Sequence, residues 1–128
     1  MQSERDLLKK EMTIVAYAGD DAANSNLPLV VNDYLGDNNL MAHMIGISIR
    51  EDDFEFFIKN LKNSKVEVTI FAEEFQEKAA KSLKVEGFLI AAFKKGERFI
   101  LVTEKEPILM DDRKAIEIIE KILQERKK

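Results

Sequence analysis

The residues best suited to chemistry gather in the stretch AYAGDDAANSNLP, where polar side chains follow a short apolar run. Asp20, Asp21, Asn24 and Ser25 could bind a cation or a hydroxyl-rich ligand through their oxygen atoms, whereas two adjacent carboxylates would repel an anion. The same residue types also dominate turns and helix N-caps. The pattern therefore favours a turn first and a ligand-binding loop second.

A second group of candidate residues follows the run KVEVTIF. Glu73 and Glu74 could act as acid–base groups or cation ligands, although glutamates in the first turn of a helix also stabilise its positive end. The single histidine, His43, lies within an apolar run, so we expect it to be packed rather than catalytic. No catalytic constellation, phosphate-binding glycine motif or metal-spaced histidine pair is recognisable. The sequence therefore leans against an enzyme and predicts neither a cofactor nor a metal.

Composition narrows the classes of protein further. With 128 residues, 45% of them hydrophobic, a single domain over residues 1–128 is expected. No apolar run is long enough to span a membrane, and the charged amino terminus does not resemble a secretory signal, so we expect a cytoplasmic protein. The chain has no cysteine, which excludes disulfides and thiolate chemistry. Its net charge of −4 argues against a nucleic-acid partner.

Alternating strand and helix patterns predict an α/β fold, in three layers with a mainly parallel central sheet of four to five strands. Apolar or alternating runs indicate strands, and apolar stripes at helical spacing indicate helices. The predicted strands are Thr13–Ala18, Met41–Ile49 and Lys65–Phe71, and the predicted helices are Leu27–Leu35, Phe54–Leu61, Glu74–Ser82 and the segment after Asp111 or Asp112. Ser25 or Asn26 should cap the first helix, and Gly36 should end it.

The segment GFLIAAFKKGERFILVTE allows two structures. Its two alanines, the lysines Lys94 and Lys95, and Gly96 favour a helix over Phe88–Lys95, followed by a strand over Arg98–Thr103 that runs parallel to the first and third strands. Alternatively, the run is apolar on both strand faces and could form a hairpin that turns at KKGE. We favour the helix.

With that helix in place, the chain from about Met12 to Glu104 resembles the DsrE/DsrF-like family of small sulfur-relay proteins. The stretch TIVAYAGDDAANSN looks like the opening strand, glycine and polar turn of that family. The stretch DDFEFFIKNLKNSKVEVTIFAEEF is similar to its second helix and third strand, and LKVEGFLIAAFKKGERFILVT to its final helix and strand. The resemblance implies a small cytoplasmic protein that works in a homo- or hetero-oligomer.

The reactive cysteine of that family is missing. The matching position is about Phe71, and the second cysteine of some members would fall near Glu74. Sulfur transfer needs a polarizable thiolate. The resemblance therefore implies a ligand-binding or partner subunit without thiol chemistry, in which Phe71, Glu73 and Glu74 occupy the place of the family's reactive site.

Two alternatives follow from the same residues. If the hairpin forms, the order of elements is that of thioredoxin, and FKKGE resembles the turn between its last two strands. Because the chain lacks C-x-x-C and a proline before GFLIAAF, it would be a redox-inactive relative. The second alternative is a cysteine-independent enzyme that uses Asp, Glu or His at the carboxyl ends of the strands.

One aromatic residue indicates a partner surface. Phe56 points about 200° away from Phe54 around the helix axis and so lies off the apolar stripe. An exposed phenylalanine on a charged helix suggests a contact. We therefore expect a dimer, a trimer or a complex with a related subunit, held together through Phe56 or the last helix, and no membrane partner.

Overall fold

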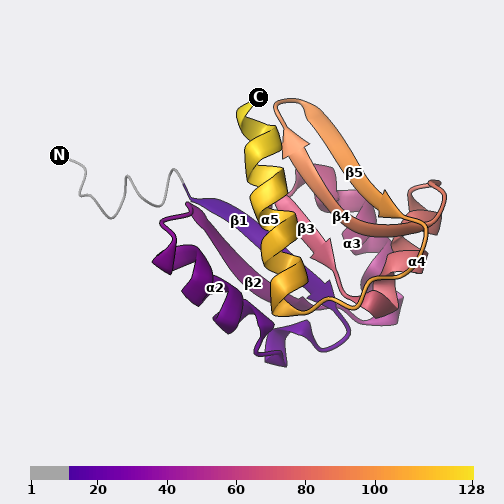
Figure 1. Cartoon of the computed structure of the whole chain (residues 1–128). Helices are drawn as coiled ribbons and strands as arrows, with labels where there is room; N and C mark the ends of the chain where they lie inside the picture. Colours follow the sequence, from indigo (N-terminus) through magenta and orange to yellow (C-terminus); the bar gives the residue numbers. More distant parts are fainter. Residues whose placement is uncertain (1–11) are drawn as a thin grey trace.

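The computed structural model describes residues 12–128, which form one five-stranded sheet with helices on both faces (Figure 1). The charged amino terminus considered above lies outside the described residues. No helix in the described part of the chain is long and apolar enough to cross a membrane. The strands are β1 (Thr13–Gly19), β2 (Ala42–Ser48), β3 (Val68–Phe71), β4 (Phe88–Lys95) and β5 (Arg98–Glu104). The helices are α2 (Leu27–Asp37), α3 (Phe54–Asn60), α4 (Glu73–Ser82) and α5 (Asp112–Lys127). Three short 3-10 turns are η1 (Ala22–Asn24), η2 (Glu51–Asp53) and η3 (Leu61–Asn63).

The strand order across the sheet is β2-β1-β3-β4-β5. Strand β1 pairs in parallel with β2 and β3, whereas β4 is antiparallel to both of its neighbours, β3 and β5. Consequently β5 runs in the same direction as the first three strands, and β4 is the only reversed strand of this sheet. The predicted three-layer α/β fold with a mainly parallel sheet is confirmed.

The predicted helix over Phe88–Lys95 is wrong, and the alternative hairpin is present. Strands β4 and β5 pair antiparallel and are joined at Gly96 and Glu97. Gly96 has φ 63°, the left-handed value that suits the first central position of a tight hairpin turn. The run Leu89–Phe93 is buried on both faces between β3 and β5, and this burial outweighs the helix preference of its two alanines.

Two hydrophobic clusters cover the two faces of the sheet. One cluster joins β1, β3 and β4 to α2 and α5, and the other joins the sheet to α3 and α4. In the second cluster the rings of Phe54 and Phe75 lie with centroids 4.8 Å apart. The apolar stripe predicted for the last helix is buried, and its fully or nearly buried members are Ala115, Ile118, Ile119 and Ile122.

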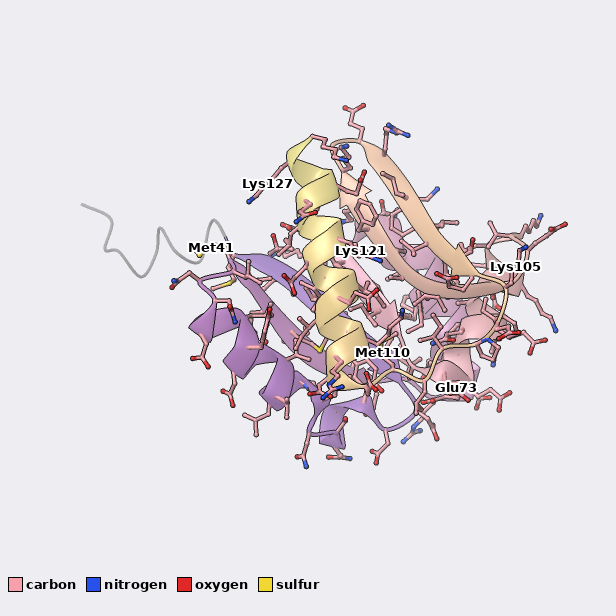
Figure 2. The ribbon with its side chains drawn as sticks, in the orientation of Figure 1. Met41, Glu73, Lys105, Met110, Lys121 and Lys127 are labelled. Atoms are coloured by element: carbon pink, nitrogen blue, oxygen red, sulfur yellow. The ribbon has the colours of Figure 1, made fainter. Side chains whose placement is uncertain are left out.

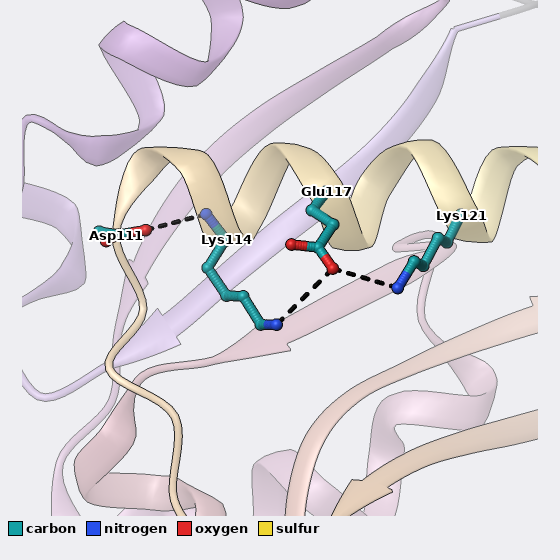
Figure 3. Close-up of polar contacts among 4 residues, drawn as sticks. All are labelled: Asp111, Lys114, Glu117 and Lys121. Atoms are coloured by element: carbon teal, nitrogen blue, oxygen red, sulfur yellow. Dashed lines mark hydrogen bonds and ion pairs between the residues drawn. The ribbon is translucent and has the colours of Figure 1, made fainter.

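Helix α5 begins as the sequence predicts. The side chain of Asp111 accepts a hydrogen bond from the backbone N–H of Lys114 at 2.8 Å (Figure 3). One turn further on, Glu117 lies 3.7 Å from the ammonium of Lys114 and 3.1 Å from that of Lys121. The hydrogen bond from Lys121 lowers the pKa of Glu117. These contacts arrange the charged face of α5 away from the core.

The end of α2 differs from the prediction. The helix continues through Gly36 to Asp37, and the residue with left-handed backbone is Asn39, with φ 55°. Asparagine tolerates this conformation better than most residues, so the glycine is not needed as a helix stop. At the other end, the N-cap residue is Asn26, whose side chain forms no capping hydrogen bond, while the Ser25 hydroxyl just before it accepts from the N–H of Leu27 at 3.1 Å.

The side chain of Asn32 joins α2 to the edge strand β2. Its Oδ1 accepts from the N–H of Met44 at 2.7 Å, and its Nδ2 donates to the carbonyl of Met44 at 2.9 Å. Strand β2 has one neighbour in the sheet, β1. The amide of Asn32 therefore occupies polar backbone groups of β2 that would otherwise be open to another strand.

A buried glutamine holds the connector between β5 and α5, residues 105–111, against α4. Gln76 is fully buried, and its Nε2 donates to the carbonyls of Phe71 at 3.0 Å and Ile108 at 2.8 Å. Its Oε1 accepts from the N–H of Ile108 at 2.8 Å. The connector has no regular secondary structure, so this amide supplies partners that a helix or strand would otherwise provide.

We expect Gln76→Leu to lower the free energy of unfolding by about 2–4 kcal/mol, because each buried polar group left without a partner costs roughly 1–3 kcal/mol. Urea denaturation followed by circular dichroism measures the change. The control is Gln124→Leu, at an exposed position on α5, which should change stability by less than about 0.5 kcal/mol. Equal losses in the two variants would show that the hydrogen bonds of Gln76 are not important.

Candidate functional site

The carboxyl ends of β1 and β3 form the topological switch point of the sheet. These parallel strands are neighbours, but the chain leaves β1 toward α2 on one face and leaves β3 toward α4 on the other. Open α/β sheets bind ligands in the crevice that such a divergence creates. Figure 2 shows Glu73 and Met110 at this end of the molecule, with Met41 and Lys127 at the opposite end.

Two predicted site residues from distant parts of the chain meet here. The Oε2 atom of Glu74 accepts a hydrogen bond from the backbone N–H of Asp20 at 2.9 Å. Beside them, a Cβ added to Gly19 would lie 2.9 Å from the Cβ of Ala72 and 3.0 Å from that same carboxylate oxygen. The loops after β1 and β3 are therefore in close contact, and they narrow the crevice between them.

Several backbone donors of the loop after β1 already have partners within the protein. The N–H of Ala23 donates to the hydroxyl of Ser48 at 2.9 Å, and the N–H groups of Asn24 and Ser25 donate to the carbonyls of Asp21 and Ala22, each at 3.2 Å. The side chains of Asn24 and Asp21 also pair, at 2.6 Å. These contacts are the turn chemistry that the sequence favours. Ligand binding by this loop stays a prediction.

Other predicted residues lie apart from this contact. Phe71 is fully buried in the cluster beneath α3 and α4, so its side chain is part of the core and cannot reach a ligand at the surface. Glu73 is exposed in the first turn of α4. His43, which we expected to be packed, is exposed on β2, because α3 begins beyond the far end of this strand and leaves its first half uncovered.

Tyr17 lies in this region but was not among the site residues predicted from the sequence. Burial raises the pKa of its phenol, and the nearby carboxylate of Glu74 raises that pKa further. The other tyrosine, Tyr34, lies 3.2 Å from Glu120, which raises the pKa of Tyr34. A polar hydroxyl within the apolar run TIVAYA was the available signal for Tyr17.

A hollow of about 370 Å³ opens at the carboxyl end of β2 and extends along α3. We call it the α3 groove. Its apolar members are Ile49, Phe56, Phe57 and Leu61, and its polar members are Ser48, Arg50, Asp53, Asn60 and Ser64. Phe56, the predicted partner residue, is 73% exposed and lies in this groove. The groove therefore combines an apolar surface with several polar groups.

Several polar groups of the α3 groove retain hydrogen-bonding capacity. Ser48 accepts from the Ala23 amide and keeps its hydroxyl hydrogen to donate. Asn60 donates to the carbonyl of Phe56 at 2.7 Å, which leaves its side-chain oxygen as an acceptor. Among residues 12–128, Arg50 and Asp53 form no ion pair. The groove thus presents a guanidinium, a carboxylate, an amide oxygen and a hydroxyl.

The described residues contain no group of three or more His, Asp or Glu side chains placed to hold a metal ion. At the carboxyl edge, Glu74 instead accepts a hydrogen bond from the backbone and Asp21 accepts one from the side chain of Asn24.

Comparison with known proteins gives structural relatives only. No protein-family profile matches the chain, and no curated protein matches it. Among solved structures, shikimate dehydrogenase 1 from Peptoclostridium difficile is similar with a TM-score of 0.60 and 12% identity, over 72% of this chain and 38% of that one. A shikimate dehydrogenase in complex with NADP+ has a TM-score of 0.59 and 11% identity, over 72% and 34% of the two chains. The 5-ketofructose reductase of a Gluconobacter strain has a TM-score of 0.59 and 11% identity, over 72% and 36%.

These comparisons correct the resemblance to DsrE/DsrF-like proteins and the subunit role that it implied. The similar structures are shikimate dehydrogenases and a 5-ketofructose reductase, not sulfur-relay proteins. The resemblance required a helix at Phe88–Lys95, where the structure has β4. The chain spans little more than a third of the length of these enzymes, and the likeness shows a shared fold.

We expect both tyrosines to ionise above the ordinary pKa of a phenol. The folded state then keeps a proton that the unfolded state loses, so stability is constant below that ordinary value and falls as the pH rises above it. Glu74→Gln should lower the pKa of Tyr17, and Glu120→Gln that of Tyr34. Ultraviolet titration measures both, since the chain has two tyrosines and no tryptophan.

The two variants serve as controls for each other, and a Tyr34→Phe background isolates the signal of Tyr17. If Glu74→Gln leaves the pKa of Tyr17 unchanged in that background, the proximity of the two groups at the switch point is refuted.

Proposed function

We propose that this chain is a ligand-binding domain for a small hydroxylated carboxylic acid, and that the α3 groove is its binding site. The observation that supports this proposal is the set of groups lining one hollow: the guanidinium of Arg50, the carboxylate of Asp53, the amide of Asn60 and the hydroxyl of Ser48. Small-molecule sites typically combine an apolar lining with a few such polar groups.

Each group matches a part of that ligand class. A guanidinium binds a carboxylate through two parallel hydrogen bonds, which supports Arg50 as the anchor for the acid. The carboxylate of Asp53 and the side-chain oxygen of Asn60 accept hydrogen bonds from ligand hydroxyls. Ile49, Phe57 and Leu61 supply an apolar surface for the carbon skeleton. The volume of about 370 Å³ suits a small ring or a short chain.

The names of the similar structures agree in part with this ligand class. Shikimate is a ring carboxylic acid with three hydroxyl groups, whereas 5-ketofructose has hydroxyl and keto groups but no carboxyl group. This chain spans little more than a third of the length of those enzymes, so the likeness carries no reaction over to it. The proposal concerns binding of the small molecule.

A dinucleotide does not fit the loop after β1. One similar structure holds NADP+, and open α/β sheets cradle a pyrophosphate on the free amides of such a loop. Here the amides of Asp20 and Ala23 already donate to Glu74 and Ser48, and two aspartates would repel the phosphates. Hydride transfer would therefore require a dinucleotide held by residues outside this loop.

We expect shikimate, used as the probe, to raise the melting temperature of the protein. A ligand at a hundred times its Kd stabilises by about 2.7 kcal/mol, which corresponds to a rise of several degrees for a domain of this size. Arg50→Gln should abolish the shift by removing the partner of the carboxylate. Lys59→Gln is the matched control, because it removes one positive charge from the exposed surface of α3, outside the groove.

Three outcomes would contradict the proposal. The first is no shift with shikimate or with other hydroxylated carboxylic acids of similar size. The second is a shift that survives Arg50→Gln. The third is a shift that is lost only when Asp20→Asn and Asp21→Asn are combined, which would move the site to the loop after β1.

A further inference from the structure

The outer edge of β5 is open. β5 is the last strand of the sheet, and among residues 12–128 no hydrogen bond from another segment reaches the backbone on its outer side. Its central residues, Phe99 to Val102, are all apolar and half-buried. An apolar edge strand of this kind is a template for pairing with a further strand. The opposite edge differs, because Asn32 bonds to the backbone of Met44 in β2.

The hairpin determines which backbone groups of β5 point outward. In a hairpin with a two-residue turn, the residues that flank the turn, here Lys95 and Arg98, exchange hydrogen bonds. Bonded and non-bonded positions then alternate along the strand, so the N–H and C=O of Phe99, Leu101 and Thr103 point away from β4. Consistently, the N–H of Lys94, opposite Phe99, donates to Glu67 on the β3 side.

The sequence of β5 is self-complementary about Leu101. In an antiparallel pairing of two copies with Leu101 opposite Leu101, Phe99 lies opposite Thr103 and Ile100 lies opposite Val102. The same register places Arg98 opposite Glu104 at both ends of the ladder. The positions that meet as bonded pairs, Phe99, Leu101 and Thr103, are those whose backbone groups point outward. In this register, the outward backbone groups of the two copies face each other and the charges at the strand ends meet opposite charges.

We propose that two copies of this chain associate through antiparallel pairing of their β5 edges, in the register centred on Leu101. The pairing would form one continuous sheet across a two-fold axis, with the same surface used by both copies. The charge pattern supports a second copy as the partner, since Arg98 and Glu104 each meet the opposite charge, and neither has an ion pair among residues 12–128.

The pairing would also cover apolar surface beside the edge. A hollow of about 130 Å³ lies between α5 and the β4–β5 hairpin, with Val102, Ile118 and Ile122 in its lining. On the other face of β5, Phe99 is approached by the ammonium of Lys62 at 5.8 Å from the ring centroid. A second β5 adds apolar neighbours to both faces of the strand. This interface is distinct from Phe56 and from the apolar stripe of the last helix.

Sedimentation equilibrium of the full chain tests the proposal, with a concentration-dependent dimer as the expected result. Arg98→Glu and Glu104→Arg should each weaken the dimer at least tenfold, because like charges then face each other at both ends. The combined exchange restores opposite charges and should restore the dimer. An equimolar mixture of the two single variants should form a mixed dimer, since their ends are complementary to each other.

Two further variants separate the edge from other surfaces. Thr103→Pro removes an outward N–H and leaves the bonds to β4 in place, so it should give a monomer with an unchanged circular dichroism spectrum. Phe56→Ser should leave the dimer intact. The proposal is overturned by a wild-type monomer at high concentration, by a trimer, by single charge variants that dimerise normally, or by loss of the dimer in Phe56→Ser.

Discussion

The position of α5 depends on the hydrogen bonds of the Gln76 side-chain amide. It bonds the end of β3, at Phe71, to the connector, at Ile108, in a position with no access to water. The connector must cross from the edge strand β5 to the middle of the sheet without a helix or strand of its own. Once it is held at Ile108, α5 is placed over β1, β3 and β4, where its apolar stripe is part of the larger of the two hydrophobic clusters described above.

At the carboxyl edge of the sheet, side chains of the protein itself bind backbone amides of the loop after β1. At the switch point, the contact of Glu74 with Asp20 replaces a ligand as the partner of the loop amide. The backbone N–H groups of Asp20 and Ala23 are therefore already bonded, and the negative charge of the loop opposes an anion. Polar side-chain groups that can still bind a ligand line the α3 groove, where Arg50 supplies the positive charge that the loop lacks.

The two edge strands, β2 and β5, differ in how far their outer backbone groups are covered. Edge strands present unpaired backbone groups, and proteins usually cover or charge them. On β2 the amide of Asn32 covers part of the edge. On β5 the charges stand only at the ends of the strand, at Arg98 and Glu104, and the residues between them are apolar. This distribution limits which partner strand can pair and in which register.

The sequence by itself determined the α/β class, the three parallel strands and the long last helix, because alternation and helical stripes are local signals of burial. It also identified the pair Asp111 and Asp112 as holding the cap, which the structure places at Asp111, and Phe56 as exposed. The helix predicted over Phe88–Lys95 was wrong. Its alanines and lysines favour a helix locally, but burial on both faces between two neighbouring strands favours the strand β4. The hydrogen bond between Asp20 and Glu74 and the lining of the α3 groove join residues far apart in the chain. Only the tertiary structure decides such contacts, because local spacing does not specify which strands become neighbours.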